Sequence, residues 1–342
     1  MSTENVLGEK MFRFLRRNVY QERGGEEGYF DEFAKAWLGN VKFHVKESSY
    51  VKYYNLVEKH ILPQLGQVKI SNFTTKLVED YIEEKLKNGK IRGKGGLSEK
   101  TVRDILVVLK EICLFARRQN VDFPCHLELI KVRAAEPEIQ VLSYKEQMCL
   151  EEFLMEDDEL TKTGILLSLY MGLRIGEVCA LQRKHIRFES GILEVRGTMQ
   201  RIQDFNGNVG TKTKVVVTEP KSISSKRDIP IPEFLMGRLR KLEDLPEAVY
   251  LLSGDEENFV EPRTLENIFK SYLRQCRMKP INYHGLRHTF ATRCVENGMD
   301  VKSLSEILGH ANVNITLNKY VHSSMDQKRR SMAKVCLISE CS

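Results

Sequence analysis

The segments HGLRHTFAT at residues 284–292 and LGHANVNITLNKY at residues 308–320 decide how this sequence is interpreted. Both lie in a region whose apolar residues recur at helical spacing. Two upstream segments add basic groups: GLRIGE at 172–177 and PKS…SKRDIPIP between 220 and 232. Each segment alone is a weak signal, because a His-x-x-Arg spacing or a lone Tyr is common by chance. Together they supply guanidiniums, a lysine, histidines and a phenol in one chain.

The combined pattern resembles the tyrosine recombinase family, also called phage-type integrases. The resemblance covers roughly residues 29–323 and is strongest over 164–323. The span 196–217 is longer than a minimal hairpin needs, which predicts a β insertion. This insertion and the TLNKY spacing before the final tyrosine are similar to those of integrases from conjugative transposons. The resemblance implies a catalytic set of six residues, present here in the family's order: Arg174, Lys221, His284, Arg287, His310 and Tyr320.

The chemistry of each group suits the role that the resemblance implies. Tyr320 would attack a DNA phosphodiester, but a phenol with a pKa of about 10 needs a base or a positive field to do so at neutral pH. Arg174 and Arg287 would hold the non-bridging oxygens through forked hydrogen bonds. Glu177 would orient Arg174 or the end of its helix. The product would be a 3′-phosphotyrosyl enzyme that a 5′ hydroxyl religates, so we expect no ATP, metal or other cofactor.

Three further groups would move protons or position the phosphate. By resemblance, Lys221 is the general acid for the leaving 5′ oxygen. His284 is the base or proton shuttle near the tyrosine, and His310 hydrogen-bonds a phosphate oxygen, because the pKa of histidine lies near neutrality. Lys226 and Arg227 remain rivals of Lys221 for the acid role.

Ordinary structural roles compete with these assignments. Arg174 could cap helix carbonyls, and Tyr320 is one of 12 tyrosines, which usually lie in cores. His284 and His288 are four residues apart, as in a helical metal pair. Gly285 stands where the zinc-protease pattern requires Glu, so we expect no zinc site and a structural role for His288.

Composition places the chain among globular proteins. Its 342 residues carry 53 Lys and Arg against 47 Asp and Glu, a net charge of +6, and 42% are hydrophobic. This length suggests roughly two domains, and the positive charge is a weak indication of an acidic partner such as nucleic acid. The first residues lack the apolar core of a signal peptide, and no apolar run is long enough to span a bilayer. The eight cysteines form no CxxC pair or zinc spacing, which favours a reducing, cytoplasmic location.

We expect a mainly α fold with a small β-sheet or hairpin. A helical core DNA-binding domain is predicted at 29–133, a linker at 134–141 and a mixed α/β catalytic domain at 142–323. Residues 1–28 form a basic N-terminal extension. Residues 324–342 form a tail that we expect to be exchanged between protomers, so its deletion should abolish cooperative assembly.

The catalytic region alternates between helical and strand patterns. TKTGILLSLYMGLRIGEVCAL, at 161–181, predicts a helix. GILEVRG at 191–197 and VVVTEPKS…KRDIPIP, at 215–222 and 226–232, are rich in β-branched residues and predict strands with Lys221 in a hairpin.

A basic run precedes the last helix of the first domain. Residues 85–103 hold seven bases and one acid, Glu99, around the Gly-rich stretch NGKIRGKGG. Ser98 is the expected N-cap of the helix that follows. The run is either a solvated loop or a strip that contacts DNA phosphates. The DNA-contacting candidates are Lys87, Lys90, Arg92, Lys94, Lys100 and Arg103.

The resemblance also implies partners. They are double-stranded DNA recombination sites held in a C-shaped clamp, a homotetramer on DNA that passes through a Holliday junction, and a possible directionality factor, with no membrane. Two other classes remain open. A type IB topoisomerase uses much the same residues to relax DNA, and a DNA-binding protein without catalysis would leave no covalent adduct.

Overall fold

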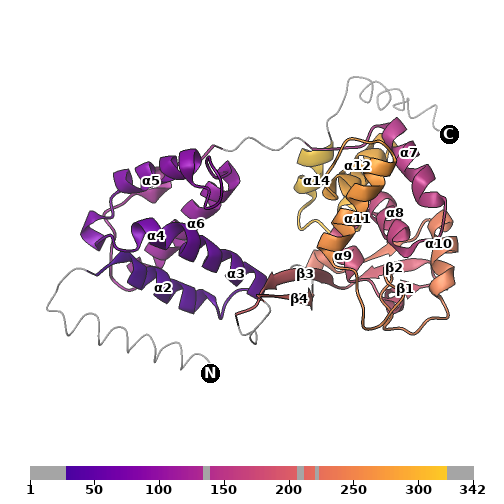
Figure 1. Ribbon diagram of the computed structural model, residues 1–342, viewed down its shortest axis with the longest axis horizontal. Helices are drawn as coiled ribbons and strands as arrows, with labels where there is room; N and C mark the ends of the chain where they lie inside the picture. The colour runs from indigo at the N-terminus through magenta and orange to yellow at the C-terminus, as the bar shows by residue number, and fades with distance from the viewer. Residues whose placement is uncertain (1–27, 134–138, 206–211, 220–222, 322–342) are drawn as a thin grey trace, which may run out of the picture. The chain divides into compact units, whose positions relative to one another are not determined.

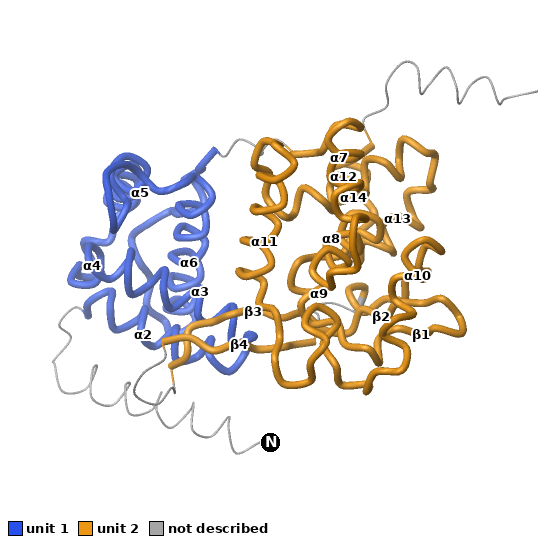
Figure 2. Tube along the Cα trace, turned by 45° about the vertical axis from the view of Figure 1, so that its right-hand side comes forward, with its two compact units in different colours: residues 1–137 blue, residues 138–342 orange. Residues whose placement is uncertain are grey.

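The computed structural model describes residues 28–133, 139–205, 212–219 and 223–321. The chain divides into two compact units, residues 1–137 and 138–342, each coloured separately in Figure 2. The predicted N-terminal extension up to residue 27, most of the linker, Lys221 and the C-terminal tail lie outside the described residues.

The first unit is helical, as Figure 1 shows. Helix α6 begins after Ser98, whose hydroxyl accepts a hydrogen bond from the amide of Thr101 at 3.2 Å, so the predicted N-cap is confirmed. A cluster of stacked and edge-on rings, centred on Phe73 with its neighbours Phe30 and Phe123, fills the core. The helices are α2 Phe30–Val41, α3 Glu47–Leu56, the π-helical turn Val57–Ile61, α4 Leu62–Leu65, α5 Thr75–Asn88 and α6 Glu99–Arg117.

The second unit is built around helix α8, Leu160–Met171. Nearly all of its residues are buried, including the polar Thr161, Lys162 and Thr163 of its first turn. It packs against helices on several sides (Figure 1). These are α7 Tyr144–Met155, α9 Ile175–Cys179, α10 Glu233–Leu239, α11 Pro262–Gln275 and α12 His284–Glu296; α13 Val301–Leu308 and α14 Val313–Tyr320 follow α12.

Two antiparallel sheets complete the second unit. One has the order β1-β2-β5, with β1 Ile186–Arg187, β2 Ile192–Val195 and β5 Arg227–Pro230. The other joins β3 Thr198–Gln203 to β4 Thr213–Thr218 and confirms the predicted β insertion. The mainly α fold class is therefore confirmed.

The predicted hairpin across Lys221 is wrong. Strand β4 pairs with β3, whereas β5 pairs with β2, so the strands on either side of that lysine belong to different sheets. Period-two alternation identifies a strand but does not say which strand will be its partner.

The helix predicted over 161–181 is interrupted at Gly172. This residue ends α8 with a φ of +65°, in the left-handed region, and α9 begins three residues later at Ile175. Such a left-handed residue is a common end to a helix. The break matters because it turns the chain and places Arg174 at the N-terminus of α9.

No helix within the described ranges has the length and apolarity needed to cross a membrane.

Gly172→Ala should destabilise the second unit. An added Cβ would lie 2.6 Å from the Phe290 ring and would force a side chain into the left-handed region. We expect the free energy of unfolding in urea to fall by about 1–3 kcal/mol from backbone strain alone.

Gly237→Ala is the matched control, because a Cβ there meets nothing within 4 Å and φ is not positive. In the interior of α10 this change should be neutral or stabilising by up to about 1 kcal/mol. Equal stability of the two variants would contradict the role given to Gly172.

Candidate active site

Arg287 is the most deeply anchored charge in the second unit. It lies on α12, is 2% exposed, and donates to the carbonyl oxygens of Gly172 at 2.7 Å and Leu308 at 2.6 Å. Its Nη2 also lies 3.0 Å from Nε2 of His310. Burial, together with the charge of Arg174, lowers the pKa of this guanidinium to about 9, which leaves it charged at neutral pH. Arg287 thus ties the end of α8 to the end of α13.

The contacts of His310 define its tautomer. A guanidinium only donates, so Nε2 of His310 accepts from Arg287 and the ring proton lies on Nδ1. Nδ1 then donates to the hydroxyl oxygen of Thr316, 2.8 Å away on α14. Burial, then the charges of Arg287 and Arg174, lower the pKa of His310 to about 4, so the ring is neutral.

Arg174 is anchored by Glu177, while 36% of its side chain stays exposed. Its Nη1 donates to Oε1 of Glu177 at 2.7 Å, and its backbone amide donates to Oε2 at 2.9 Å. The exposed fraction is large enough for a bound anion to reach the guanidinium. This geometry agrees with the orienting role expected for Glu177.

Glu177 also binds a second guanidinium, that of Arg227 on β5. Both side chains are buried, and the two Nη atoms of Arg227 lie 3.1 and 2.9 Å from the carboxylate oxygens. Burial disfavours the charged carboxylate, but the hydrogen bonds and charge of Arg227, with the charge of Arg174, lower the pKa of Glu177 to about 2. One buried carboxylate therefore serves two arginines.

Further contacts fix the position of the Arg227 side chain. It donates to the carbonyl oxygens of Ile307 and Ser225, and a Cβ at Gly309 would press on its side chain at 3.1 Å. A permanently charged, sealed guanidinium is a poor proton donor, so this placement speaks against Arg227 as a rival general acid. The other rival, Lys226, is ion-paired with Glu219 at 2.9 Å.

Tyr320 ends helix α14, and its side chain is only 7% exposed. Its hydroxyl lies 2.7 Å from Nδ1 of His288, one turn along α12 from His284. Burial raises the pKa of Tyr320, while the charges of Arg287 and Arg174 oppose that rise. We expected His288 to be structural; the structure places it on the hydroxyl of the proposed nucleophile.

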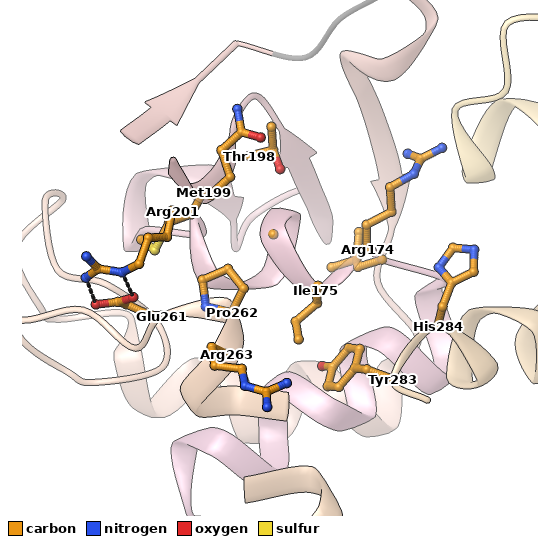
Figure 3. Close-up of a pocket in the computed structure, with 13 residues that line it drawn as sticks. Arg174, Ile175, Thr198, Met199, Arg201, Glu261, Pro262, Arg263, Tyr283 and His284 are labelled. Carbon is orange, nitrogen blue, oxygen red and sulfur yellow. Dashed lines mark hydrogen bonds and ion pairs between the residues drawn. The ribbon is translucent and has the colours of Figure 1, made fainter. Parts of the chain in front are cut away.

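His284 lies at the exposed start of α12. Its ring packs edge-on against the ring of His288, with centroids 4.5 Å apart. It lines a cavity of about 490 Å³ together with Arg174. Figure 3 shows Arg174 and His284 at one end of this cavity and the ion pair between Arg201 and Glu261 at the other.

Lys319 is a cation that sequence reasoning missed. It directly precedes Tyr320 and is partly buried; burial, then the charges of Arg287 and Arg174, lower its pKa. Its ammonium also contributes to the lowered pKa values of the site histidines. Only its position next to Tyr320 in the sequence offered a signal, and one adjacent lysine is too common to be specific.

The four sequence segments meet where the structure describes them, the 220–232 segment through the ion pair of Arg227 with Glu177. Arg287 contacts Gly172 and His310, and His288 contacts Tyr320. The remaining predicted residue, Lys221, falls in the gap between 219 and 223. In the part of the chain that is described, no group of three or more His, Cys, Asp or Glu side chains is arranged to hold a metal ion.

The basic strip lies on the first unit. The candidates Lys87, Lys90, Arg92, Lys94, Lys100 and Arg103 are all exposed. The seventh base of the run, Lys85, is instead 8% exposed, with its ammonium 5.2 Å from the centre of the Tyr81 ring. Gly96 allows the loop to close on the end of α5, since a Cβ there would overlap the carbonyl oxygen of Leu86.

Comparison with known proteins identifies the family. The phage integrase family matches residues 147–327, and the N-terminal SAM-like domain of phage integrases matches residues 29–86. The chain belongs to the phage integrase family: it is a tyrosine recombinase, an enzyme that cleaves and rejoins DNA strands in site-specific recombination. The predicted resemblance is thereby confirmed.

Individual relatives span most of the chain. A XerC-like tyrosine recombinase from Caldanaerobacter subterraneus is 27% identical over 321 residues, covering 86% of this chain and 80% of the relative. The ICEBs1 integrase of Bacillus subtilis is 24% identical over 341 residues, covering 93% of this chain and 86% of the relative.

Solved structures share the fold. The Tn1549 transposon integrase in complex with circular intermediate DNA matches with a TM-score of 0.68 and 22% identity, over 89% of this chain and 99% of that one. A lambda integrase tetramer bound to a Holliday junction matches with a TM-score of 0.63 and 14% identity, over 88% of this chain and 80% of that one.

Glu177→Gln should strongly destabilise the second unit at neutral pH, because it leaves Arg227 buried without an anion. Removing one partner of a buried ion pair costs about 3–5 kcal/mol. The wild-type pKa of Glu177 is lowered from 4.5 to about 2, so its contribution is present above pH 4.5 and is lost as the pH falls towards 2. Urea denaturation between pH 2 and 7 should therefore show a flatter pH dependence in the variant.

Glu189→Gln is the control, since Glu189 is exposed in the same unit and the charge change is identical. The role assigned to Glu177 is wrong if both variants keep the wild-type stability profile.

Proposed function

We propose that Arg174, Lys221, His284, Arg287, His310 and Tyr320 form the catalytic site of this recombinase, with Tyr320 as the nucleophile. The observation that carries the proposal is the placement of one partly exposed guanidinium, that of Arg174, beside a fully buried one, that of Arg287, with Tyr320 within range of both charges. A tetrahedral phosphate offers two non-bridging oxygens, and two guanidiniums can bind one each.

Charge balance supports phosphate as the missing partner. Glu177 is shared by Arg174 and Arg227, while the neighbours of Arg287 are carbonyl oxygens and a neutral ring. The described cluster therefore carries excess positive charge in a poorly hydrated position. A phosphodiester would offset this charge, and the greater negative charge of the transition state would be favoured more strongly still.

His310 would then change its hydrogen bonds on binding DNA. Its Nε2 accepts from Arg287 in the free protein, and an acceptor cannot also donate to a phosphate oxygen. The negative phosphate raises the pKa of a nearby imidazole, so His310 can gain a proton at Nε2 and donate it as a hydrogen bond. Thr316 keeps the ring oriented through Nδ1 during this change.

Proton transfer to the leaving 5′ oxygen and from the attacking tyrosine oxygen requires two different groups. We assign Lys221 as the general acid for the 5′ oxygen on the strength of the family pattern. His284 is exposed, borders the cavity beside Arg174 and packs on His288, which suits it to shuttle protons between the site and solvent. In this scheme the arginines supply the electrostatic stabilisation, and neither metal nor ATP is required.

The proposed partners follow from the relatives. We propose that the substrate is the paired ends of a mobile element, with integration or excision as the outcome, since the ICEBs1 and Tn1549 integrases are among the similar proteins. We further propose a homotetramer on DNA, as in the lambda integrase complex, a directionality factor, and a cytoplasmic location.

Tyr320→Phe should abolish covalent attachment to a nicked suicide substrate but leave DNA affinity within about twofold, because only one hydroxyl is lost. The readout is a protein–DNA adduct on a denaturing gel, with affinity measured by mobility shift. Adduct formation by the Phe variant would assign the nucleophile to another residue. Joint molecules from two marked duplexes, as opposed to relaxed circles alone, separate recombination from topoisomerase activity.

Charge reversal in the basic strip should weaken DNA binding in a salt-dependent way. For the triple change Lys90→Glu, Arg92→Glu and Lys94→Glu, we expect the slope of log affinity against log salt to fall by ~3, since each lost phosphate contact removes ~0.9. The matched control reverses Lys42, Lys59 and Lys76, which are exposed elsewhere in the first unit. An equal loss in both triples would mean that net charge, and not the strip, determines binding.

A further inference from the structure

The hydroxyl of Tyr320 forms a hydrogen bond with a histidine ring nitrogen in the free protein. Nδ1 of His288 lies 2.7 Å from Oη, and the two ring centroids are 5.6 Å apart. Each side chain is only 7% exposed, so water does not compete freely for this contact. The pair joins α12 to α14, and α12 also carries Arg287.

In the free protein the tyrosine keeps its proton and the histidine ring is neutral. Burial, then the charges of His284, Lys319 and Arg287, lower the pKa of His288 to about 3, so the ring is neutral and one nitrogen is free to accept. Burial raises the pKa of Tyr320, so its oxygen keeps its proton until reaction. A bound phosphate is negative and raises the pKa of a nearby imidazole, so His288 becomes a stronger base when DNA is bound. It can then take the phenolic proton as the tyrosine oxygen bonds to phosphorus.

The two histidines of HGLRH thus occupy different places. His288 contacts Oη of Tyr320, whereas His284 is exposed and lines the cavity with Arg174. Their rings meet edge-on with centroids 4.5 Å apart, and His284 is exposed whereas His288 is buried. The resemblance to the family pointed to the first histidine of this segment as the base; the geometry favours the second.

We infer that His288 is a catalytic residue, the general base that accepts the Tyr320 proton through Nδ1. This inference rests on the proposed function, in which Tyr320 is the nucleophile. In the forward step the Oη–H bond breaks, the Oη–P bond forms and the P–O5′ bond breaks. The phenolic proton moves to Nδ1, and the 5′ oxygen takes a proton from the general acid. Religation reverses each transfer.

His288→Asn tests this role directly. The amide oxygen of Asn can still accept a hydrogen bond near the position of Nδ1, but it cannot act as a base near neutral pH. We expect single-turnover cleavage of a suicide substrate to slow by about 10²-fold or more, with DNA affinity retained. Cleavage within threefold of the wild-type rate would overturn the inference.

His185→Asn is the matched control. His185 lies in the same unit, and its Nδ1 likewise accepts a hydrogen bond, from the amide of Gln182 at 2.9 Å. We expect this variant to cleave within twofold of wild type. Thermal melting of both variants establishes that they are folded at the assay temperature.

The pH profile separates a base from a residue that only positions the tyrosine. Without a base, attack depends on the small ionised fraction of Tyr320, so the log rate of the Asn variant should rise by about one per pH unit between pH 7 and 9. Wild type should be flatter. His284 and His310 also face His288; their pKa values are lowered to about 4 in the free protein. Both rings are present in wild type and in the Asn variant, so any titration they undergo with DNA bound is common to the two profiles. The other charged groups that face His288 are Lys319 and Arg287. Both are present in wild type and in the Asn variant. Parallel profiles would reduce His288 to a positioning residue and overturn the inference.

A substrate with sulfur in place of the bridging 5′ oxygen tests which end of the reaction is affected. A thiol has a pKa of about 8.5, so it leaves without an acid. The Asn variant should remain slow on this substrate. Restoration to the wild-type rate would place His288 at the leaving group and overturn the assignment.

Nitrogen NMR of the wild-type protein needs no variant. With ¹⁵N-labelled histidine, Nδ1 of His288 should show the shift of an unprotonated ring nitrogen in the free enzyme. A proton on Nδ1, donated to Oη, would overturn the inference. Failure of the proposed function is distinguishable, because wild type itself would then form no adduct through Tyr320.

Discussion

The organisation of the site depends on a guanidinium that has been removed from water. Arg287 is 2% exposed, and its guanidinium contacts two helix-end carbonyls and one imidazole nitrogen. Burying a cation is tolerable only when such partners are fixed in advance. Gly172 supplies one of them by turning the chain at the end of α8, and the same turn delivers Arg174. The position of Arg174 thus follows from the turn at Gly172 that also supplies a carbonyl oxygen to the buried Arg287.

The second feature is the shortage of negative charge around the arginines. Glu177 is the carboxylate that Arg174 and Arg227 share, and its ionisation is maintained by them against the effect of burial. The guanidinium of Arg227 is buried and joins strand β5 to α13 through the carbonyl oxygen of Ile307. The guanidinium of Arg174 remains accessible to solvent. The same residue type is therefore used once as a structural cation and once, in the proposed site, as a ligand for the phosphate. Sequence position alone does not separate these uses.

Local patterns in the sequence predicted the helices, the helical first domain and the family, because apolar spacing and the six-residue order are each readable along the chain. Strand partners were not predictable, since the pairing of β5 with β2 is set by burial of both in a shared core. The contacts of His288 and Arg227 were not predictable either, for a common reason. Their roles depend on which atom they meet, Oη of Tyr320 or the carboxylate of Glu177, and those contacts span 32 and 50 residues.

Helix α14 is short, yet it carries both Thr316 and Tyr320 on one buried face, one turn apart. Thr316 orients His310 and Tyr320 meets His288, so both histidines depend on the same eight-residue helix being docked. Undocking of α14 would therefore remove the proposed nucleophile and release the ring of His310 at the same time. In the proposed site, docking of this one helix therefore couples the supply of the nucleophile to the orientation of a phosphate-binding histidine.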